Sequence, residues 1–282
     1  MQTTCWIETL GLDIRQRFYN AAGIRTRCIE SGEGPPLIMI HGTGGHAEAF
    51  MRNFRELGRH FRVFAVDMVG HGYTDKPGHD YTLPVYAEHL TAFMDAAGIR
   101  RAHLHGESLG GWIAAWTALH YPERVDRLVL NTAGGFRSDP ETMKKVRDST
   151  LEAVRNVSLE SVRKRLAWLF YDPSQVTDEL VEVRRLIYSQ PEMLRAMEHV
   201  LCLQDMAIRE PYILVPERLA KIRHKTLVLW TSNDPTAPID VGREAQRHIP
   251  DSTFVVMNEC GHWPQWENPP EFDRINIKFF AG

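Results

Sequence analysis

The stretch His103-Leu104-His105-Gly106-Glu107-Ser108-Leu109-Gly110-Gly111 runs from an apolar segment through a glycine-rich turn into a second apolar segment. Its Gly106, Ser108 and Gly110 fit the pattern G-x-S-x-G, in which a serine occupies a strained turn between a strand and a helix, with its oxygen exposed. The pattern therefore predicts a strand, a sharp turn and a helix, with Ser108 as a nucleophile. An ordinary turn is the alternative, because glycine and serine are common in turns.

A serine hydroxyl is a poor nucleophile unless a base takes its proton, and that base needs an orienting carboxylate. Asp234 follows the apolar run 226–230 and His262 follows the run 253–257, so we expect both in loops after strands. In a parallel sheet, such loops lie at the same edge as Ser108. Taken one at a time, an aspartate in a turn and a histidine in a loop are ordinary features of proteins. The chain order serine, aspartate, histidine favours a catalytic triad of the hydrolase type.

An oxyanion that forms on an attacked carbonyl needs two N–H donors. The first turn of the helix after the nucleophile supplies one, from Leu109. The run His41-Gly42-Thr43-Gly44-Gly45 ends the predicted strand 37–41 and supplies the other, from Thr43. We expect His41 itself to be a structural hydrogen-bonding residue.

Short β-rich runs alternate with amphipathic helical stretches in the first half of the chain and again near its end. This order predicts an α/β fold, with a mostly parallel central sheet and helices on both faces. Residues 137–212 lack β-branched runs and keep helical spacing, which predicts a helical cap inserted into a core of residues 1–136 and 213–282. The predicted strands are residues 26–30, 37–41, 63–68, 102–107, 125–132, 226–230 and 253–257; the predicted helices are residues 47–58, 83–97, 109–120, 143–170, 178–203, 240–248 and 270–279.

The composition is typical of a globular protein, with 282 residues, 43% hydrophobic residues and a net charge of −3. Such a balance gives no electrostatic reason to expect nucleic acid or an anionic membrane as a partner. Residues 1–19 lack the apolar core of a signal peptide, and we expect no membrane span. Cys5, Cys28, Cys202 and Cys260 lie far apart and form no CxxC, which favours the reducing cytoplasm.

A dinucleotide site of an oxidoreductase is the main rival interpretation of the first glycine run. The segment 42–47 resembles its fingerprint, and Asp67 lies about twenty residues further on, where a ribose-binding acid is expected. However, the segment follows a later strand rather than the first, and such a site explains none of the triad residues.

A metal site is the other alternative. His103 and His105 share one face of a predicted buried strand without a third ligand nearby. We therefore expect neither a metal nor an organic cofactor.

Residues 260–267, Cys-Gly-His-Trp-Pro-Gln-Trp-Glu, are very similar to the CGHWxQWE segment around the catalytic histidine of the meta-cleavage product hydrolases. In the predicted cap, Arg184 lies some seven residues before Pro191, as in members of that family. Over nearly its whole length, the chain resembles these α/β-hydrolases, which break a carbon–carbon bond in vinylogous 1,5-diketones from ring-cleaved aromatic compounds. The broader motifs HGxG and GxSxG are shared with esterases and lipases.

The resemblance implies an α/β-hydrolase fold, a triad of Ser108, Asp234 and His262, and an oxyanion hole formed by the Thr43 and Leu109 amides. It also implies a serine-type hydrolase of aromatic hydrocarbon catabolism. The enzyme would cleave a 2-hydroxy-6-oxo-hexa-2,4-dienoate-type substrate into a carboxylic acid and a 2-hydroxypenta-2,4-dienoate. The partner would be this small molecule, and a homodimer is common in the family.

Four residues are expected to contact the substrate. Arg184 matches the family's arginine near the dienoate carboxylate, which a guanidinium binds through a fork of donors. Trp266 matches an indole that packs against the conjugated chain. Gly42 and Glu107 lie beside the nucleophile. The alternatives are a solvated helix-face charge for Arg184 and a structural packing role for Trp266.

The chain departs from the family pattern on the substrate side. Glu107 stands where members usually carry Asn, residues 43–46 replace the usual Gly-Pro-Gly-Ala, and Ala49 stands where many members carry a substrate-facing Asn. A carboxylesterase with the same triad is therefore the first alternative function. A non-catalytic ligand receptor is the second.

Overall fold

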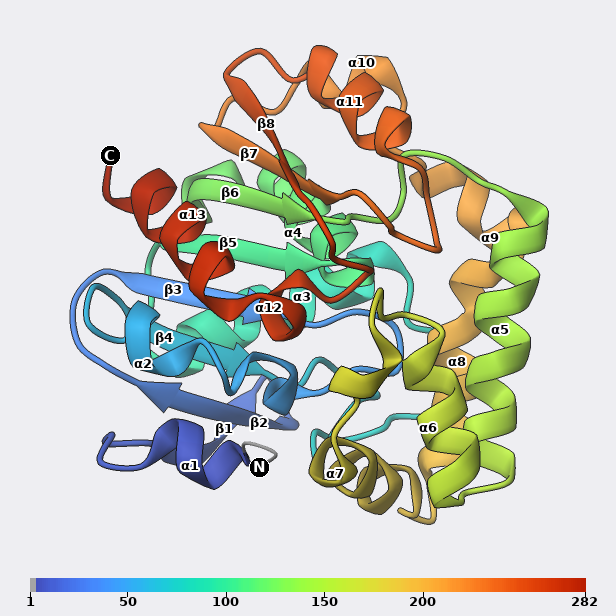
Figure 1. The fold of residues 1–282 in the computed structure, drawn as a ribbon. Helices are drawn as coiled ribbons and strands as arrows, with labels where there is room; N and C mark the ends of the chain where they lie inside the picture. The colour runs from blue at the N-terminus through green and yellow to red at the C-terminus, as the bar shows by residue number, and fades with distance from the viewer. Residues whose placement is uncertain (1–3) are drawn as a thin grey trace.

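The computed structural model describes residues 4–282, and its centre is an 8-stranded sheet with the order β1-β2-β4-β3-β5-β6-β7-β8 (Figure 1). Strands β4, β3, β5, β6, β7 and β8 pair in parallel, whereas β1, β2 and β4 pair antiparallel. The strands are β1 Arg15–Ala21, β2 Ile24–Ser31, β3 Pro36–Ile40, β4 Arg62–Val66, β5 Ala102–Glu107, β6 Val125–Asn131, β7 Thr226–Thr231 and β8 Ser252–Met257. This confirms the mostly parallel sheet that the sequence predicts.

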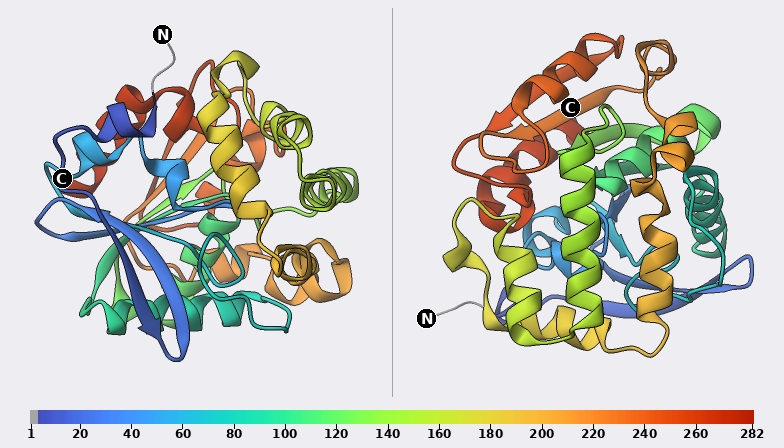
Figure 2. Two further views of the ribbon diagram at one scale, coloured as in Figure 1. Left: turned by 90° about the horizontal axis from the view of Figure 1, so that it is seen from below. Right: turned by 90° about the vertical axis from the view of Figure 1, so that its right-hand side faces the viewer.

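Helices cover both faces of the sheet (Figures 1 and 2). Helices α3 and α4 pack on one face, α2 and α13 lie on the other, and α11 packs against β7 and β8. Strand β5 is buried along its whole length because β3 and β6 flank it and helices cover it, which explains its apolar sequence. These helices are α2 Phe54–Leu57, α3 Leu83–Ala96, α4 Leu109–His120, α11 Ile239–Arg247 and α13 Pro269–Ala281, and the short ones outside the cap are α1 Cys5–Thr9, α10 Pro216–Leu219 and α12 Pro264–Glu267.

Strand β1 is missing from the sequence-based expectation. Five of its 7 residues are exposed, so it carries no apolar run. It joins β2 through Ala22 and Gly23, whose φ angles of 51° and 94° fit a two-residue hairpin turn. An edge strand of this kind is held by its backbone pairing more than by burial, and apolar pattern cannot reveal it.

Three helical expectations are wrong in detail. The predicted helix over residues 178–203 is divided into α7 Asp178–Tyr188, α8 Met193–Val200 and the 3-10 turn η4 Leu201–Gln204. Residues 47–58 form only the 3-10 turn η1 Ala47–Phe50 and the short α2, because tertiary contacts direct this segment: the Ala47 N–H donates to Asp67, and the Asn53 amide donates to the Gln265 carbonyl and to Asp273. The predicted helix over residues 143–170 is divided in two. Ser158 caps the second part through its side chain and begins a new helix there.

The segment between β6 and β7 lies over the carboxyl ends of the parallel strands (Figure 1). Its two ends meet where the Leu214 N–H donates to the Gly135 carbonyl at 2.8 Å. We propose on this basis that residues 137–212 form the cap. It contains α5 Pro140–Arg155, α6 Leu159–Ala167, η3 Pro173–Gln175, α7 Asp178–Tyr188, α8 Met193–Val200, η4 Leu201–Gln204, α9 Met206–Arg209 and η5 Glu210–Tyr212.

In residues 4–282, we find no helix with the length and apolar character that a bilayer crossing requires.

Candidate active site

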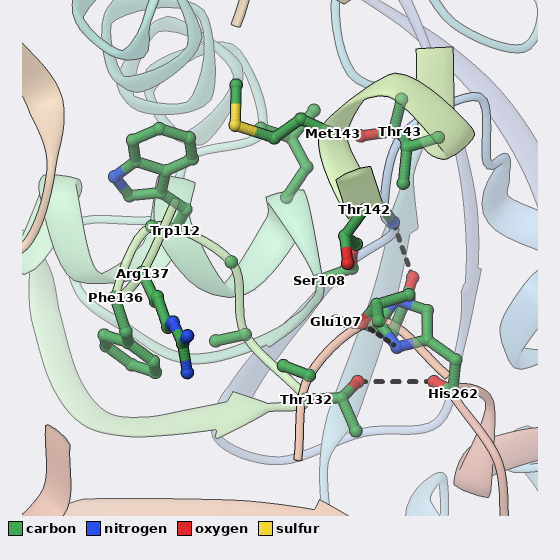
Figure 3. A pocket seen from close by; sticks show the side chains of 18 of the residues that line it. Thr43, Glu107, Ser108, Trp112, Thr132, Phe136, Arg137, Thr142, Met143 and His262 are labelled. Carbon is green, nitrogen blue, oxygen red and sulfur yellow. Dashed lines mark hydrogen bonds and ion pairs between the residues drawn. The ribbon is translucent and has the colours of Figure 1, made fainter. Parts of the chain in front are cut away.

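Ser108 occupies the sharp turn between β5 and α4, with φ 55° and ψ −117°. The flanking glycines are required there. A Cβ on Gly106 would lie 2.1 Å from the Gly110 carbonyl oxygen, and a Cβ on Gly110 would lie 2.1 Å from the Ile40 oxygen. The close approach of strand and helix thus holds the serine in a conformation that L-residues rarely adopt. Ser108 lines a cavity of about 340 Å³ beneath the cap (Figure 3).

His262 and Asp234 come together from the loops after β8 and β7. His262 Nδ1 lies 3.0 Å from both carboxylate oxygens of Asp234, and the His262 side chain is almost fully buried. Thr236 donates its hydroxyl proton to the same carboxylate at 2.7 Å. The pairing orients the imidazole with Nε2 toward the cavity, as a general base beside Ser108 requires.

The Glu107 carboxylate contacts Nε2 of His262, the ring nitrogen that does not face Asp234. One carboxylate oxygen, Oε1, lies 3.2 Å from His262 Nε2, and the other, Oε2, accepts the Gly42 N–H at 2.6 Å (Figure 3). Throughout the described residues, Ser108 Oγ makes no hydrogen bond to His262. Glu107 and Ser108 are therefore alternative partners for Nε2, which is a feature that the sequence did not indicate.

The two ionisable groups of this contact influence each other. Burial disfavours the imidazolium form of His262, but the carboxylates of Asp234 and Glu107 outweigh it, so the pKa of His262 is raised above its ordinary value. Burial also raises the pKa of Glu107, against the attraction of His262 and the Gly42 N–H. A histidine flanked by two carboxylates keeps its proton to a higher pH than a histidine paired with a single aspartate.

The predicted oxyanion-hole residues lie at the same cavity. Thr43 and Leu109 both line it. Gly42 lines it too, but its N–H is already bound by Glu107. His41 is buried behind them: Nε2 accepts the Met68 N–H, and burial lowers the pKa of His41 to about 4, which favours the neutral ring. Its surroundings fit the structural role expected of it.

Glu267, the acid at the end of the 260–267 segment, holds the loop that carries His262. The Glu267 carboxylate accepts the N–H groups of Gly261 and Trp263 and, from the cap, that of Tyr171. The His262 N–H in turn donates to the Leu169 carbonyl of the cap at 2.7 Å. The loop is therefore fixed to the cap by backbone hydrogen bonds.

The rival sites of the sequence analysis have structural explanations. Asp67 is fully buried, pairs with Arg27 at 3.0 Å and accepts the Ala47 and Tyr73 N–H groups, so its oxygens are already engaged and not available to a ribose. His105 is buried against α13, where Nδ1 lies 2.8 Å from the Asn276 side-chain oxygen. His103 stacks on Phe280.

Comparison with known proteins decides the family. The family model described as alpha/beta hydrolase fold matches residues 35–269. The chain is 34% identical over 259 residues to a 2-hydroxy-6-oxo-6-phenylhexa-2,4-dienoate hydrolase of Comamonas testosteroni, with 89% of each chain covered. The chain belongs to the meta-cleavage product hydrolases of the alpha/beta hydrolase fold. This confirms the family expected from the segment 260–267.

Two further relatives agree with this assignment. A 2-hydroxy-6-oxo-2,4-heptadienoate hydrolase of Pseudomonas putida is 33% identical, with 94% of this chain and 96% of the relative covered. A solved structure of the meta-cleavage product hydrolase from Pseudomonas fluorescens IP01, a serine-to-alanine variant complexed with acetates, has a TM-score of 0.82 at 33% identity and covers 94% and 97% of the two chains. The protein is therefore a hydrolase of a family that acts on carbon–carbon bonds.

Two residues that the family resemblance places against the substrate do not line the cavity of this hydrolase. Arg184 is fully buried behind the wall, 4.9 Å from the Trp263 ring centroid and with its Nε 3.4 Å from His46 Nε2. The Trp266 indole donates to the Gln175 carbonyl and faces away, because its ring packs toward Arg52. Trp263, and not Trp266, supplies the aromatic wall. Ala49 is buried outside the cavity lining.

The cavity of the hydrolase is lined by apolar and by cationic side chains. Trp112, Phe136 and Met143 line it together with Arg137 (Figure 3). Arg209, whose guanidinium carbon lies 4.5 Å from the centroid of the Trp112 ring, lines it too. Near Glu107 and His262, it contains a buried guanidinium, that of Arg165.

The sequence analysis missed Arg165, although a signal was present. Val162, Leu166 and Leu169 mark the buried face of this cap segment, and Arg165 lies on that same face.

Proposed function

We propose that the protein hydrolyses a carbon–carbon bond in a 2-hydroxy-6-oxo-hexa-2,4-dienoate-type product of aromatic ring cleavage, releasing a carboxylic acid and a 2-hydroxypenta-2,4-dienoate. The observation that carries the proposal is the position of Ser108, on its strained turn, in the wall of one cavity that combines aromatic side chains with buried guanidinium groups. A dienoate that bears an acyl group combines a conjugated apolar chain with a carboxylate. The names of the two curated relatives give this substrate class.

The geometry supports the following roles for the triad residues. After the dienol is converted to the ketone, which moves its hydroxyl proton to the carbon that will leave, Ser108 or a water attacks the distal carbonyl. His262, held by Asp234, takes the nucleophile's proton. Charge on the carbonyl oxygen develops toward the Thr43 and Leu109 amides. Collapse expels a resonance-stabilised dienolate, and water hydrolyses the acyl-enzyme if one has formed.

In this scheme, His262 must exchange Glu107 for the nucleophile as the partner of Nε2. Asp234 holds the other ring nitrogen of His262 and so anchors the imidazole during this exchange. Besides the water that hydrolysis consumes, the proposed reaction needs no group outside the chain and the substrate. We also propose a cytoplasmic location, which the spacing of the four free cysteines supports, and a homo-oligomer, which the family resemblance supports.

One assay separates the proposed reaction from ester hydrolysis. We expect the purified protein to bleach the yellow 2-hydroxy-6-oxohepta-2,4-dienoate with a kcat/KM at least about a hundredfold above that for p-nitrophenyl acetate. Ser108→Ala should bind the dienoate and lose turnover by more than about a thousandfold. Ester turnover alone would instead favour a carboxylesterase, and inertness to both substrates would favour a receptor.

A further inference from the structure

The glycine-rich loop after β3, which carries the proposed oxyanion donor Thr43, contacts the cap at Gly44. The φ angle of Gly44 is 69°, and a Cβ on this residue would lie 2.7 Å from the Tyr188 hydroxyl oxygen, 3.4 Å from Thr150 Cγ2 and 3.6 Å from Met197 Cε. These three side chains come from α7, α5 and α8. A glycine therefore lets the loop lie directly against three helices of the cap, in a conformation that other residues rarely adopt.

The contact with α7 is a hydrogen bond to the backbone of this loop. Tyr188, the last residue of α7, is 3% exposed, and its hydroxyl donates to the Gly44 carbonyl at 2.8 Å. Tyr188 does not line the cavity. Any effect of its hydroxyl on the reaction must therefore pass through the loop.

Two peptide groups connect Tyr188 to the Thr43 N–H. The first joins Gly44 to Gly45, and its carbonyl accepts from Tyr188. Its N–H donates to the Gly42 carbonyl at 2.9 Å. The second joins Gly42 to Thr43. In a planar trans peptide, the C=O and N–H bonds point in opposite directions, so a carbonyl that is held on one side directs its N–H to the other side.

His41 holds the same carbonyl from its own side of the loop. Its Nε2 accepts the Met68 N–H at 3.2 Å, so the proton of the neutral ring lies on Nδ1, which donates to the Gly42 carbonyl at 2.9 Å. Within residues 4–282, the Thr43 N–H makes no hydrogen bond. A Cβ on Gly42 would lie 2.8 Å from Ser108 Cβ, so this N–H belongs to a peptide group directly beside the nucleophile.

We propose that Tyr188 is a positioning residue of the oxyanion hole. Its hydroxyl fixes the Gly44–Gly45 peptide, and that peptide fixes the peptide whose N–H, on Thr43, faces the oxygen of the attacked carbonyl. Hydrogen bonds that follow one another in this way also polarise one another, which strengthens the last donor. The inference rests on the oxyanion hole of the proposed function, and it makes the geometry of that hole depend on the position of α7.

Tyr188→Phe keeps the ring and removes only the hydroxyl. Complete removal of an oxyanion donor costs about a hundredfold or more in kcat, so a loosened donor predicts a smaller loss of about tenfold. With 2-hydroxy-6-oxohepta-2,4-dienoate as the substrate, KM should stay within about twofold, because the interaction acts in the transition state. Tyr81→Phe is the matched control. Tyr81 is also buried and donates to a backbone carbonyl, that of Pro77 at 2.6 Å, but it lies outside the cavity lining, and its loss should leave kcat unchanged.

Phenylboronic acid gives a readout that a merely structural role would not change. It forms a tetrahedral adduct on a nucleophilic serine, with one oxygen where the oxyanion forms, and so acts as a transition-state analogue. Its inhibition constant should weaken in Tyr188→Phe by the factor by which kcat falls, about tenfold, and stay unchanged in Tyr81→Phe. A lower unfolding temperature with unchanged kcat and inhibition constant would overturn the proposal. So would a loss in kcat without weaker inhibition.

Gly44→Ala breaks the same contact from the core side, because its Cβ would displace the Tyr188 hydroxyl. In the double variant, kcat should therefore be close to that of Gly44→Ala alone. Losses that multiply would show that Tyr188 acts elsewhere and would overturn the proposal. Thermal unfolding shows whether each variant is folded at the assay temperature, and Gly44→Ala replaces Tyr188→Phe in the inhibition measurement if the latter is not.

Failure of the proposed function gives a different pattern. A wild type that leaves the dienoate intact but hydrolyses p-nitrophenyl acetate refutes carbon–carbon cleavage. Ester hydrolysis develops the same oxyanion beside Ser108, so the loss of about tenfold in Tyr188→Phe is then measured on ester turnover. A wild type that does not bind phenylboronic acid would refute the oxyanion hole itself, and the role of Tyr188 with it.

Discussion

At the scale of single residues, the position before Ser108 bears on how His262 acts in the proposed mechanism. In that mechanism, His262 Nε2 must be unprotonated to take the proton of Ser108. In this protein, Nε2 faces Glu107 while Nδ1 faces Asp234, so carboxylates contact the imidazole on both sides. The raised pKa of His262 therefore places the acidic limb of the pH–rate profile above the ordinary pKa of histidine.

Glu107→Gln tests this interpretation. Glutamine keeps the length of the side chain and can still accept the Gly42 N–H, but it removes one of the charges that stabilise the imidazolium. The acidic limb of kcat/KM should move to lower pH, so the variant retains a larger fraction of its maximal kcat/KM in mildly acidic buffer than the wild type does. A profile that keeps its midpoint, or moves to higher pH, would contradict the role given to Glu107.

At the scale of secondary-structure elements, the last helix buries an acidic side chain whose ionisation lowers the free energy of unfolding. Asp273, on α13, is 3% exposed and accepts a hydrogen bond from the Asn53 amide at 2.9 Å. Burial raises its pKa to about 8. Above the ordinary pKa, the unfolded chain releases this proton while the folded chain keeps it, so the free energy of unfolding falls as the pH rises toward 8.

Asp273→Asn cannot titrate, and its amide can still accept from Asn53, whose own buried Oδ1 lacks a partner and can receive the new N–H. Relative to the wild type, the variant should gain stability between about pH 5 and pH 8, by an amount on the order of a few kcal/mol. Urea unfolding at several pH values measures the difference. Since other groups titrate in both proteins, a difference that stays constant with pH would refute the raised pKa of Asp273.

The same scale shows what the sequence can predict. Strands β3, β5, β6 and β7 follow from their mainly apolar runs because both faces of each strand are covered. Strand β8 lies at one edge and is only partly buried, but it keeps an apolar run, whereas β1 lies at the other edge and has none. The Ser-Asp-His order predicts residues that do meet at one cavity, because parallel strands bring their following loops to one edge. Helical spacing places Arg165 on the buried face of α6, but it does not show what lies against that face, so the contact of Arg165 with the cavity could not be predicted.

At the scale of the whole molecule, the cap and the catalytic loop form one continuous structure. His262 and Gly261 lie against the backbone of residues 169–171, and the Glu267 carboxylate joins N–H groups from both sides. The position of the imidazole therefore depends on how closely the cap sits on the core. A residue without a side chain is needed where the two backbones meet, and Gly261 is that residue.

Gly261→Ala should separate the two backbones at this contact. Its new Cβ would lie 2.4 Å from the Leu169 carbonyl oxygen and 2.6 Å from the Tyr171 nitrogen, and neither backbone atom can turn aside as a flexible side chain would. Displacement of the imidazole by about 1 Å predicts a loss in kcat on the order of a hundredfold, and overpacking predicts about 1–3 kcal/mol less stability. Turnover is measured well below the unfolding temperatures of both proteins, so that the loss reports geometry and not unfolding. A variant that is destabilised but keeps kcat within about twofold would show that the cap contact supports the fold without positioning His262.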